Sequence, residues 1–283
     1  TNAPGGFVVA LRDTDHDGHA ETIARFGAMY ENGKPGGGTG IAIHHGELYV
    51  ESAGSILRYG LAGGALVPSR STETILSGLP LDGDHTMHPF AIAADGSLYV
   101  NSGSATNSCQ QKNGTLESPG AQPCNELATR AGIWRYTTTK TDQVHWPQGR
   151  FITGTRNAVA LAVHPTENVL YAVLHGRDQL DSNWPKLYTA KENNEQPAEI
   201  FVRAEAGQDY GWPTCYFDPN QNRHVLAPEY GGDGGKKLGP CAGKARPIST
   251  FPAHWAPEAP AFASQSLPEH YQGGAFVAFH GSW

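Results

Sequence analysis

Charged residues and long apolar runs are both scarce in this sequence. Only 17% of its 283 residues are charged, and the formal net charge is −7. No cluster of basic residues stands out, and proteins that bind nucleic acid usually carry one, so we expect no nucleic-acid partner. No apolar run approaches the roughly 20 residues that a membrane-spanning helix needs, and we therefore expect no membrane span.

Helical periodicity is nearly absent as well, whereas turn residues are abundant. The chain holds 35 Gly and 20 Pro, a composition that argues against a helical or a disordered protein. A chain of this length can bury a large core, and all-β barrels and propellers of this size form one domain. These features favour an all-β protein.

Cysteine is rare, and the few cysteines form two local pairs. Cys109 and Cys124 enclose a polar loop, and Cys215 and Cys241 enclose a second long stretch without a strand or helix pattern. Such loops are uncommon unless they are functional or tied down, and none of the spacings is a CxxC zinc pattern. We therefore predict two local disulfides. They indicate a periplasmic or secreted protein, since disulfides persist in oxidising compartments. Free buried thiols are the alternative.

The chain also resembles itself. Residues 40–61 are echoed by residues 89–104, whose closing strand 131–137 comes later, and again by residues 158–176. Each copy has an alternating apolar strand, a turn built on Gly or Pro, and a strand of the LYV type. A period of about 40–50 residues with several short strands per unit is typical of a β-propeller blade. We expect a single propeller domain over residues 1–283.

The number of blades is the next expectation. At about 50 residues per blade, roughly four or five full blades fit into the chain. Propellers close on themselves to protect their strand edges, and the last stretch, GGAFVAFHGSW, stops without a turn. We therefore expect an incomplete propeller with partial first and last blades, as in a chain truncated at both ends.

A stretch near the N-terminus resembles the first half of a calcium-binding loop: Asp13, Asp15, Asp17 and Gly18. An EF-hand loop also needs a Glu at its last position and flanking helices. That position is Ala24, and residues 7–11 have a strand pattern. Asp and Gly are also what a tight hairpin turn favours. The stretch is therefore either a plain hairpin turn or a turn stabilised by calcium.

Polar residues gather in three clusters beside apolar strands of successive repeats. They are Asp84, His85 and His88 before the second repeat, Arg156 and Asn157 before the third, and His175, Gly176, Arg177 and Asp178 at the exit of the next strand. Propellers bind ligands where strand ends converge on the axis, and buried charges must be paired or in use. Three clusters in register predict a shared axial site. For each residue alone, a satisfied core or rim position is the alternative.

Several spaced motifs, in order, match a known family. The motifs are GDH before DG-LYV, RN-x-x-x-LA-x-HP, LHGRDQL, DYGWPTCY, FPAHWAP and GAFVAFHGSW. Together they resemble the PQQ-dependent sugar dehydrogenases. This group includes soluble glucose dehydrogenase, L-sorbosone dehydrogenase and pyranose dehydrogenase. The resemblance covers nearly the whole chain. It implies a six-bladed propeller with PQQ on its axis, held by a calcium ion.

The resemblance also implies roles for individual residues. His85 matches the general base that takes the proton of the sugar hydroxyl, and Asp84 matches the residue that orients this His. Arg156 matches the arginine that lies against the quinone, and Asn157 its neighbour at the cofactor.

A further part of the resemblance concerns calcium. His175, Gly176 and Arg177 match the next cofactor-binding stretch, in which the backbone carbonyls of Gly176 and Arg177 bind the calcium ion of PQQ. Glu199 corresponds to a second, structural calcium site, although its spacing to Tyr210 differs by one residue from the family pattern.

The implied function is oxidation of an aldose or related sugar. A neutral His is a natural base near pH 7, hydride passes to PQQ, and electrons leave to an external acceptor such as a cytochrome or quinone. Two other functions stay open. One is a non-catalytic carbohydrate-binding or interaction propeller that has lost tight PQQ binding, which would have no need of His85 facing a cation. The other is a calcium-dependent lactonase-type hydrolase, for which only Asn157 and Asp178 offer side-chain ligands.

Overall fold

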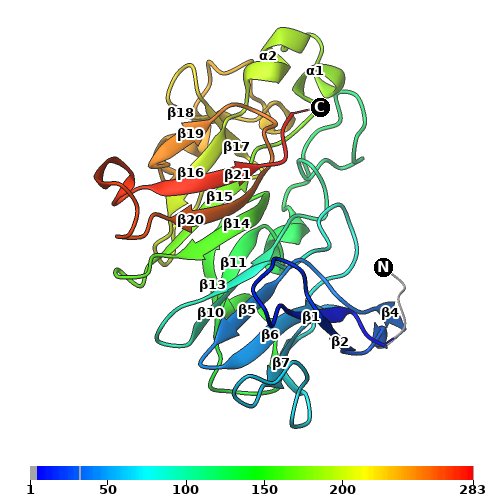
Figure 1. Cartoon of the computed structure of the whole chain (residues 1–283). Helices are drawn as coiled ribbons and strands as arrows, with labels where there is room; N and C mark the ends of the chain where they lie inside the picture. The colour runs from blue at the N-terminus through cyan, green and yellow to red at the C-terminus, as the bar shows by residue number, and fades with distance from the viewer. Residues whose placement is uncertain (1–4, 32, 283) are drawn as a thin grey trace.

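Strands dominate the computed structural model, which describes residues 5–31 and 33–282 (Figure 1). The prediction of a mostly β protein is thereby confirmed. The α-helices of the described residues are short, α1 (Leu180–Asn183) and α2 (Ala190–Glu195). Among those residues, no helix has the length and the apolar character that crossing a membrane requires.

Each of the three larger sheets carries one of the predicted repeats. The first consists of β5 (Ile41–His44), β6 (Glu47–Ser52), β7 (Ser55–Gly60) and β8 (Glu73–Ser77), with β12 (Gln143–Val144) added parallel to β8. The second consists of β9 (Phe90–Ile92), β10 (Ser97–Ser102), β11 (Gly132–Thr137) and β13 (Arg150–Thr153). The third consists of β14 (Asn157–Val163), β15 (Leu170–His175), β16 (Glu199–Arg203) and β19 (Ser249–Phe251). Apart from β12, each strand pairs antiparallel with the next one in its sheet, which is the meander that the repeats predict.

The first strands of the sheets lie side by side. β5 contacts β9, β9 contacts β14, and β14 contacts β20 (Pro257–Phe262), which pairs antiparallel with β21 (Ala275–Phe279). This order brings together the chain segments that enter and leave these strands. The remaining hairpins are β1 (Val8–Arg12) with β2 (Thr22–Phe26), β3 (Tyr30–Glu31) with β4 (Lys34–Pro35), and β17 (Cys215–Asp218) with β18 (Arg223–Leu226).

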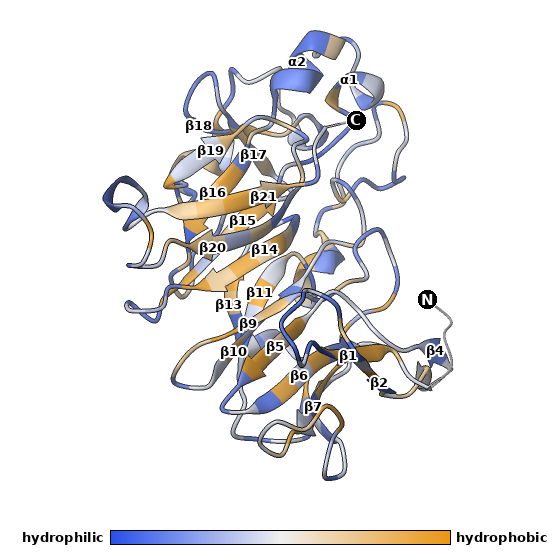
Figure 2. Ribbon diagram, in the orientation of Figure 1, coloured by the Kyte–Doolittle hydropathy of each residue, from blue (hydrophilic) through white to orange (hydrophobic). Residues whose placement is uncertain are grey.

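Strand β10 shows how the alternating pattern builds the core. All six of its residues are buried, because its two faces pack against different layers. Leu98 and Val100 join a cluster with the first sheet, whereas Tyr99 joins the larger cluster with the third sheet. Successive side chains of a strand point to opposite faces, so this one strand links both cores. Figure 2 shows the apolar strands and the more polar loops between them.

The acidic stretch after β1 is the turn of the β1–β2 hairpin. The Asp13 carboxylate accepts hydrogen bonds from the backbone N–H groups of His16 at 2.6 Å and Gly18 at 2.9 Å. The Gly18 N–H and its neighbours lower the pKa of Asp13. Glu21 accepts a bond from the Thr14 N–H at 2.6 Å. The carboxylates of Asp13, Asp15, Asp17 and Glu21 lie within 4.8 Å of one another. The stretch is thus the turn of a hairpin whose carboxylates bind its own backbone, and a calcium ion at this turn stays a prediction.

Both predicted disulfides are present. Cys109–Cys124 joins Cα atoms 6.2 Å apart, and Cys215–Cys241 joins Cα atoms 5.8 Å apart. Closing loops of these lengths stabilises a fold by roughly 3 kcal/mol each in the chain-entropy description. The two loops contact each other, since the Tyr230 hydroxyl lies 3.4 Å from the Cys109 carbonyl oxygen.

Candidate functional site

The second and third predicted clusters meet at the ends of the second and third sheets. Asn157 opens β14 and is the register partner of His175 at the end of β15. The Asn157 amide oxygen accepts a hydrogen bond from Asn101 at 2.9 Å, and Asn101 lies in β10. Arg156 donates to the Gly176 carbonyl at 3.0 Å. These contacts join the second and third clusters, whereas His88 of the first is fully buried with both ring nitrogens at backbone carbonyls, and the shared axial site stays a prediction.

Gly103 is the point where the clusters approach most closely. A Cβ atom added there would lie 2.6 Å from the His85 Cβ and 2.7 Å from the Asn157 amide oxygen. No side chain fits in that space, so a glycine is required by close approach rather than by its backbone angles. Gly103 directly follows Ser102, the last residue of β10, and directly precedes Ser104, which contacts His85.

His85 is held by Ser104 rather than by Asp84. The His85 Nδ1 lies 2.7 Å from the Ser104 carbonyl oxygen, so Nδ1 carries the proton and Nε2 offers its lone pair. The Asp84 residue is exposed, and its backbone N–H binds the Ala105 carbonyl at 2.8 Å. In this structure a carbonyl of Ser104 occupies Nδ1, and the orienting role that the resemblance implied for Asp84 stays a prediction.

The environment of His85 favours its neutral form. Burial, together with the nearby Arg156 cation, lowers the pKa of His85 to about 4. A neutral imidazole at pH 7 can accept a proton at Nε2. Its low pKa makes it a weak base that stays unprotonated in mildly acidic solution.

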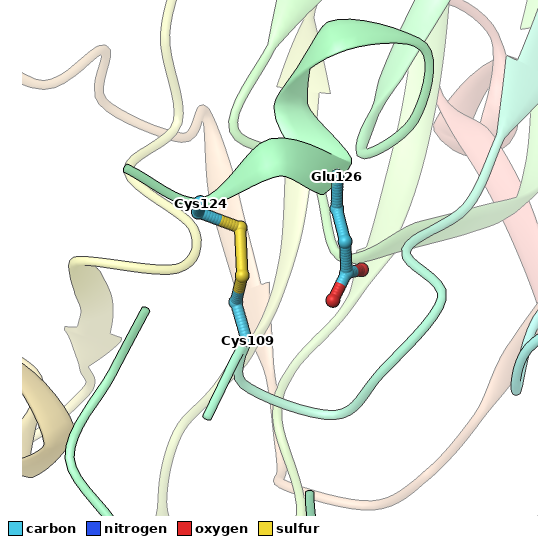
Figure 3. Close-up of side chains that lie close together, drawn as sticks. All are labelled: Cys109, Cys124 and Glu126. Atoms are coloured by element: carbon cyan, nitrogen blue, oxygen red, sulfur yellow. A yellow bond between two sulfur atoms is a disulfide. The ribbon is translucent and has the colours of Figure 1, made fainter. Parts of the chain in front are cut away.

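Ser104 is positioned by Arg156 and, through its neighbours, by Glu126, which lies two residues after Cys124. The Ser104 N–H donates to the Arg156 carbonyl at 2.7 Å. The next residues, Ala105 and Thr106, donate their N–H groups to the Glu126 carboxylate at 2.6 and 3.1 Å. Figure 3 shows Glu126 beside the Cys109–Cys124 disulfide, on the short helical turn that follows Cys124. The sequence analysis missed Ser104 and Glu126, since neither stands in a recognisable motif.

Arg156 is nearly buried and binds two residues of one turn, Gly176 and Asp178. Its Nη1 donates to the Gly176 carbonyl, and its Nη2 forms an ion pair with Asp178 at 2.7 Å, with 11% of the side chain exposed. Its Nε is buried, and no acceptor among the described residues contacts it. One donor of this guanidinium is therefore left for another group.

Asp178 has a second partner that the sequence analysis did not assign. The His254 Nδ1 lies 3.0 Å from the Asp178 carboxylate, and His254 Nε2 lies 2.7 Å from the Asn193 carbonyl oxygen in α2. The bond to Asp178 is the main cause that raises the pKa of His254. His254 belongs to the FPAHWAP motif, so the motif was noticed but the residue was not singled out.

Glu199 and His175 complete the surroundings of the turn. Glu199, at the start of β16, accepts the Gly176 N–H at 2.7 Å, and burial raises the pKa of Glu199 to about 7. Within the part of the chain that the structure describes, Glu199 belongs to no group of three or more potential metal ligands. The second calcium site stays a prediction. The His175 Nε2 lies 2.8 Å from the Pro257 carbonyl oxygen, so this ring nitrogen faces β20.

Arg177 turns its side chain away from Arg156. Its Nη1 contacts Glu229 at 2.5 Å, and both side chains are buried. A small pocket lies against this turn, and its walls include Arg156, Gly176, Arg177 and Trp212. The arrangement thus offers backbone carbonyls, a spare guanidinium donor and a neutral base in one place.

A family profile matches most of the chain. The profile described as TrAA12-like matches residues 31–283. The chain is also 32% identical over 132 residues to a Borreliella burgdorferi protein described as uncharacterized. That match covers 46% of this chain and 29% of the relative, so the chain spans less than a third of the relative's length.

Two solved structures share the fold. One is a calcium structure of a Trichoderma reesei carbohydrate-active enzyme of family AA12, at 18% identity and a TM-score of 0.73, covering 98% of this chain and 69% of that one. The other is the holo form of the PQQ domain of pyranose dehydrogenase from Coprinopsis cinerea, at 15% identity and a TM-score of 0.73, covering 99% of this chain and 67% of that one. The predicted resemblance is confirmed at the level of family and fold.

Proposed function

The chain belongs to the TrAA12-like family, and from this membership we propose that it oxidises an aldose or related sugar with PQQ and Ca²⁺. One observation carries the proposal: a neutral His85, the Arg156 guanidinium and the Gly176 carbonyl meet at one end of the sheets. A base, a cation for developing negative charge and an oxygen ligand for a hard metal suit the oxidation of an alcohol by a quinone.

The proposed architecture is a six-bladed propeller, with residues 1–283 in one domain. The neighbouring order of the first strands β5, β9, β14 and β20 supports it. In such a propeller these strands surround the axis, and the segments beside His85 and Arg156 lie at its mouth. The likeness of fold to the PQQ domain of pyranose dehydrogenase supports the same arrangement.

The residues fit the two proposed cofactors. The Gly176 carbonyl already faces a cation, the Arg156 guanidinium, and a carbonyl oxygen has a second lone pair for a metal ion. No hydrogen-bond donor from the described residues contacts the Arg177 carbonyl. The Arg156 Nε is an orphaned buried donor that an acidic or quinone oxygen would satisfy. Gly176 and Arg177 would hold the ion through these carbonyls, and Arg156 and Asn157 would contact the quinone.

When bound, PQQ would supply the hydride acceptor and Ca²⁺ would supply a Lewis acid. The chain supplies proton transfer and orientation. His85 Nε2 removes the proton of the sugar hydroxyl while the Ser104 carbonyl holds Nδ1–H and stabilises the imidazolium that forms. Arg156 stabilises developing negative charge, and Asp178 fixes its orientation. An external acceptor, a cytochrome or a quinone, then takes the electrons. The two disulfides support action in the periplasm or outside the cell.

Reconstitution with PQQ and Ca²⁺, followed by dye reduction over a panel of aldoses, tests this function. We expect turnover by the wild type and a loss of about 10²- to 10⁴-fold in His85→Ala, the range of general-base catalysis. His19→Ala, which removes an exposed histidine of the acidic turn, is the matched control and keeps wild-type turnover. Undiminished turnover by His85→Ala would contradict the assignment of the base. Sugar binding without any dye reduction would favour the non-catalytic propeller instead.

A further inference from the structure

The geometry around Arg177 assigns a role to a residue outside every motif: we propose that Glu229 is a positioning residue for the Gly176–Arg177 turn. This inference rests on the proposed function, in which the two carbonyls of the turn bind Ca²⁺. Glu229 lies in the short 3-10 helix Pro228–Tyr230, inside the loop that Cys215–Cys241 closes. It is 52 residues away from Arg177 in the sequence.

The Arg177–Glu229 pair is the most deeply buried ion pair that the described residues form. The exposed fractions of the two side chains are 3% and 0%, and Nη1 and Oε2 lie 2.5 Å apart. The other carboxylate oxygen accepts bonds from the Trp184 indole N–H at 2.9 Å and the Ser108 hydroxyl at 3.2 Å. A buried ion pair is weak evidence for stability, because desolvation offsets its attraction. Its fixed geometry is the feature that a binding turn uses.

The pair fixes where the carbonyls of the turn point. With its side chain bound to Glu229, Arg177 cannot swing toward Arg156 and its backbone is held. The Arg177 Nε and Nη2 also reach the Asp178 carbonyl, at 3.3 and 3.2 Å. The side chain therefore spans from Glu229 back to the turn itself.

Asn107, which lies two residues before Cys109, clamps the same turn. Its amide oxygen accepts the Asp178 N–H at 2.9 Å, and its amide nitrogen donates to the Asp178 carbonyl at 2.8 Å. The Asn107 carbonyl in turn accepts the Trp212 indole N–H at 2.9 Å. Both backbone groups of Asp178 are thus occupied, whereas the Gly176 carbonyl accepts one bond, from Arg156, and no donor among the described residues contacts the Arg177 carbonyl.

Glu229 also connects the two disulfide loops. Its backbone carbonyl accepts the Gly120 N–H at 2.9 Å, and Gly120 lies within the Cys109–Cys124 loop. Glu229 therefore connects both disulfide loops to the Gly176–Arg177 turn. Partners of this kind orient metal ligands, and their removal costs about 10- to 100-fold in metal affinity.

The test measures calcium binding and folding separately. Glu229→Gln keeps the shape of the side chain, and the double variant Arg177→Met with Glu229→Leu replaces the buried pair by apolar side chains of similar size. For each variant we would measure the midpoint of thermal unfolding. We would also titrate Ca²⁺ in the presence of PQQ and record the Ca²⁺ concentration at which half of the PQQ-induced quenching of tryptophan fluorescence is reached. We expect the double variant to unfold near the wild-type temperature but to need about 10- to 100-fold more Ca²⁺.

Asp218→Asn is the matched control. Asp218 is buried in the same disulfide loop and accepts the Asn220 N–H at 2.9 Å, but it contacts no residue of the turn. We expect this variant to lose stability without a change in the Ca²⁺ requirement. A double variant with both wild-type stability and a wild-type Ca²⁺ requirement would overturn the positioning role, because the pair would then be structural only.

A second readout does not depend on the proposed function. The Asp178 amide hydrogen is held by Asn107, so its exchange with solvent reports the order of the turn. We expect exchange at least tenfold faster in Glu229→Gln than in wild type or Asp218→Asn. If wild-type protein binds no PQQ, the proposed function fails, whereas unchanged exchange in Glu229→Gln sinks the positioning role by itself.

Discussion

Two turns of this molecule differ both in their acidic residues and in the contacts that hold them. The acidic turn, residues 13–21, has four acidic residues and resembles a calcium loop, yet it is largely exposed and its carboxylates bind its own backbone. The turn Gly176–Asp178 has one carboxylate and no cluster of acidic residues. It is held by partners from five distant parts of the chain: Asn107, Arg156, Glu199, Glu229 and His254. The two turns thus differ in what holds them: the first is held by its own backbone and the second by segments that are distant in the sequence.

The largest effect should come from removing one member of the buried pair. Glu229→Ala leaves the Arg177 cation buried without its partner, and we expect a loss of about 3–5 kcal/mol in the free energy of unfolding. Asp15→Ala in the acidic turn should change it by no more than about 0.5 kcal/mol, as exposed substitutions usually do. Urea denaturation of both variants checks this. Equal losses of unfolding free energy in the two variants would mean that the two turns do not differ in their contribution to stability.

Opening the second disulfide should come next. Cys215→Ser with Cys241→Ser releases a loop with a sequence separation of 26 residues, and the chain-entropy description gives a loss of roughly 3–4 kcal/mol. Because that loop carries Glu229, the exchange of the Asp178 amide should also become faster, while amides of the acidic turn keep their rates. Hydrogen exchange followed by mass spectrometry measures both regions in one sample. Equal exchange rates of the Asp178 amide with and without the disulfide would show that the loop does not affect the order of the turn.

A pair of glycine variants sharpens the comparison at an intermediate magnitude. In Gly103→Ala the new Cβ would meet His85 and Asn157 at less than 3 Å, and overpacking of this kind costs about 1–3 kcal/mol. We expect sugar oxidation to fall as well, because His85 must move. Gly18→Ala, in the acidic turn, meets no atom within 4 Å but has a φ of +91°, so it should cost about 1 kcal/mol and leave turnover unchanged. Chemical denaturation and steady-state kinetics distinguish these outcomes.

The smallest effect should be a pH dependence that arises at His254. Its pKa is raised in the folded protein, mainly by the bond to Asp178. A raised folded pKa means that His254 contributes its full stability below its unfolded pKa of about 6.5, and that this contribution is lost as pH rises through the folded value. The difference in unfolding free energy between wild type and His254→Gln should therefore shrink from pH 6 to pH 8. A difference that grows over this range would show that the Asp178–His254 bond does not carry the effect.

The sequence predicted the sheets because their signals are local. The LYV strands around Tyr49 and Tyr99 alternate with a period of two, and their turns lie within a few residues of them, so the repeats fall on the observed sheets. The disulfides were also predictable, since each joins the nearer cysteine across one loop. The resemblance to a family located His85, Arg156 and Asn157, whose roles stay proposals.

The sequence could not indicate the partners that hold these residues. Asp84 stands next to His85 in the chain, but adjacent residues leave the backbone in different directions, and the tertiary structure brings Ser104 to the imidazole instead. Ser108 and Glu229 are 121 residues apart, and their contact depends on how the segment before Cys109 packs against the second disulfide loop. The strand pattern and the disulfide loops were thus determined by short-range chemistry. The hydrogen-bonded frame of the site was decided only by the tertiary structure, because each of its bonds joins segments that meet after the sheets have packed.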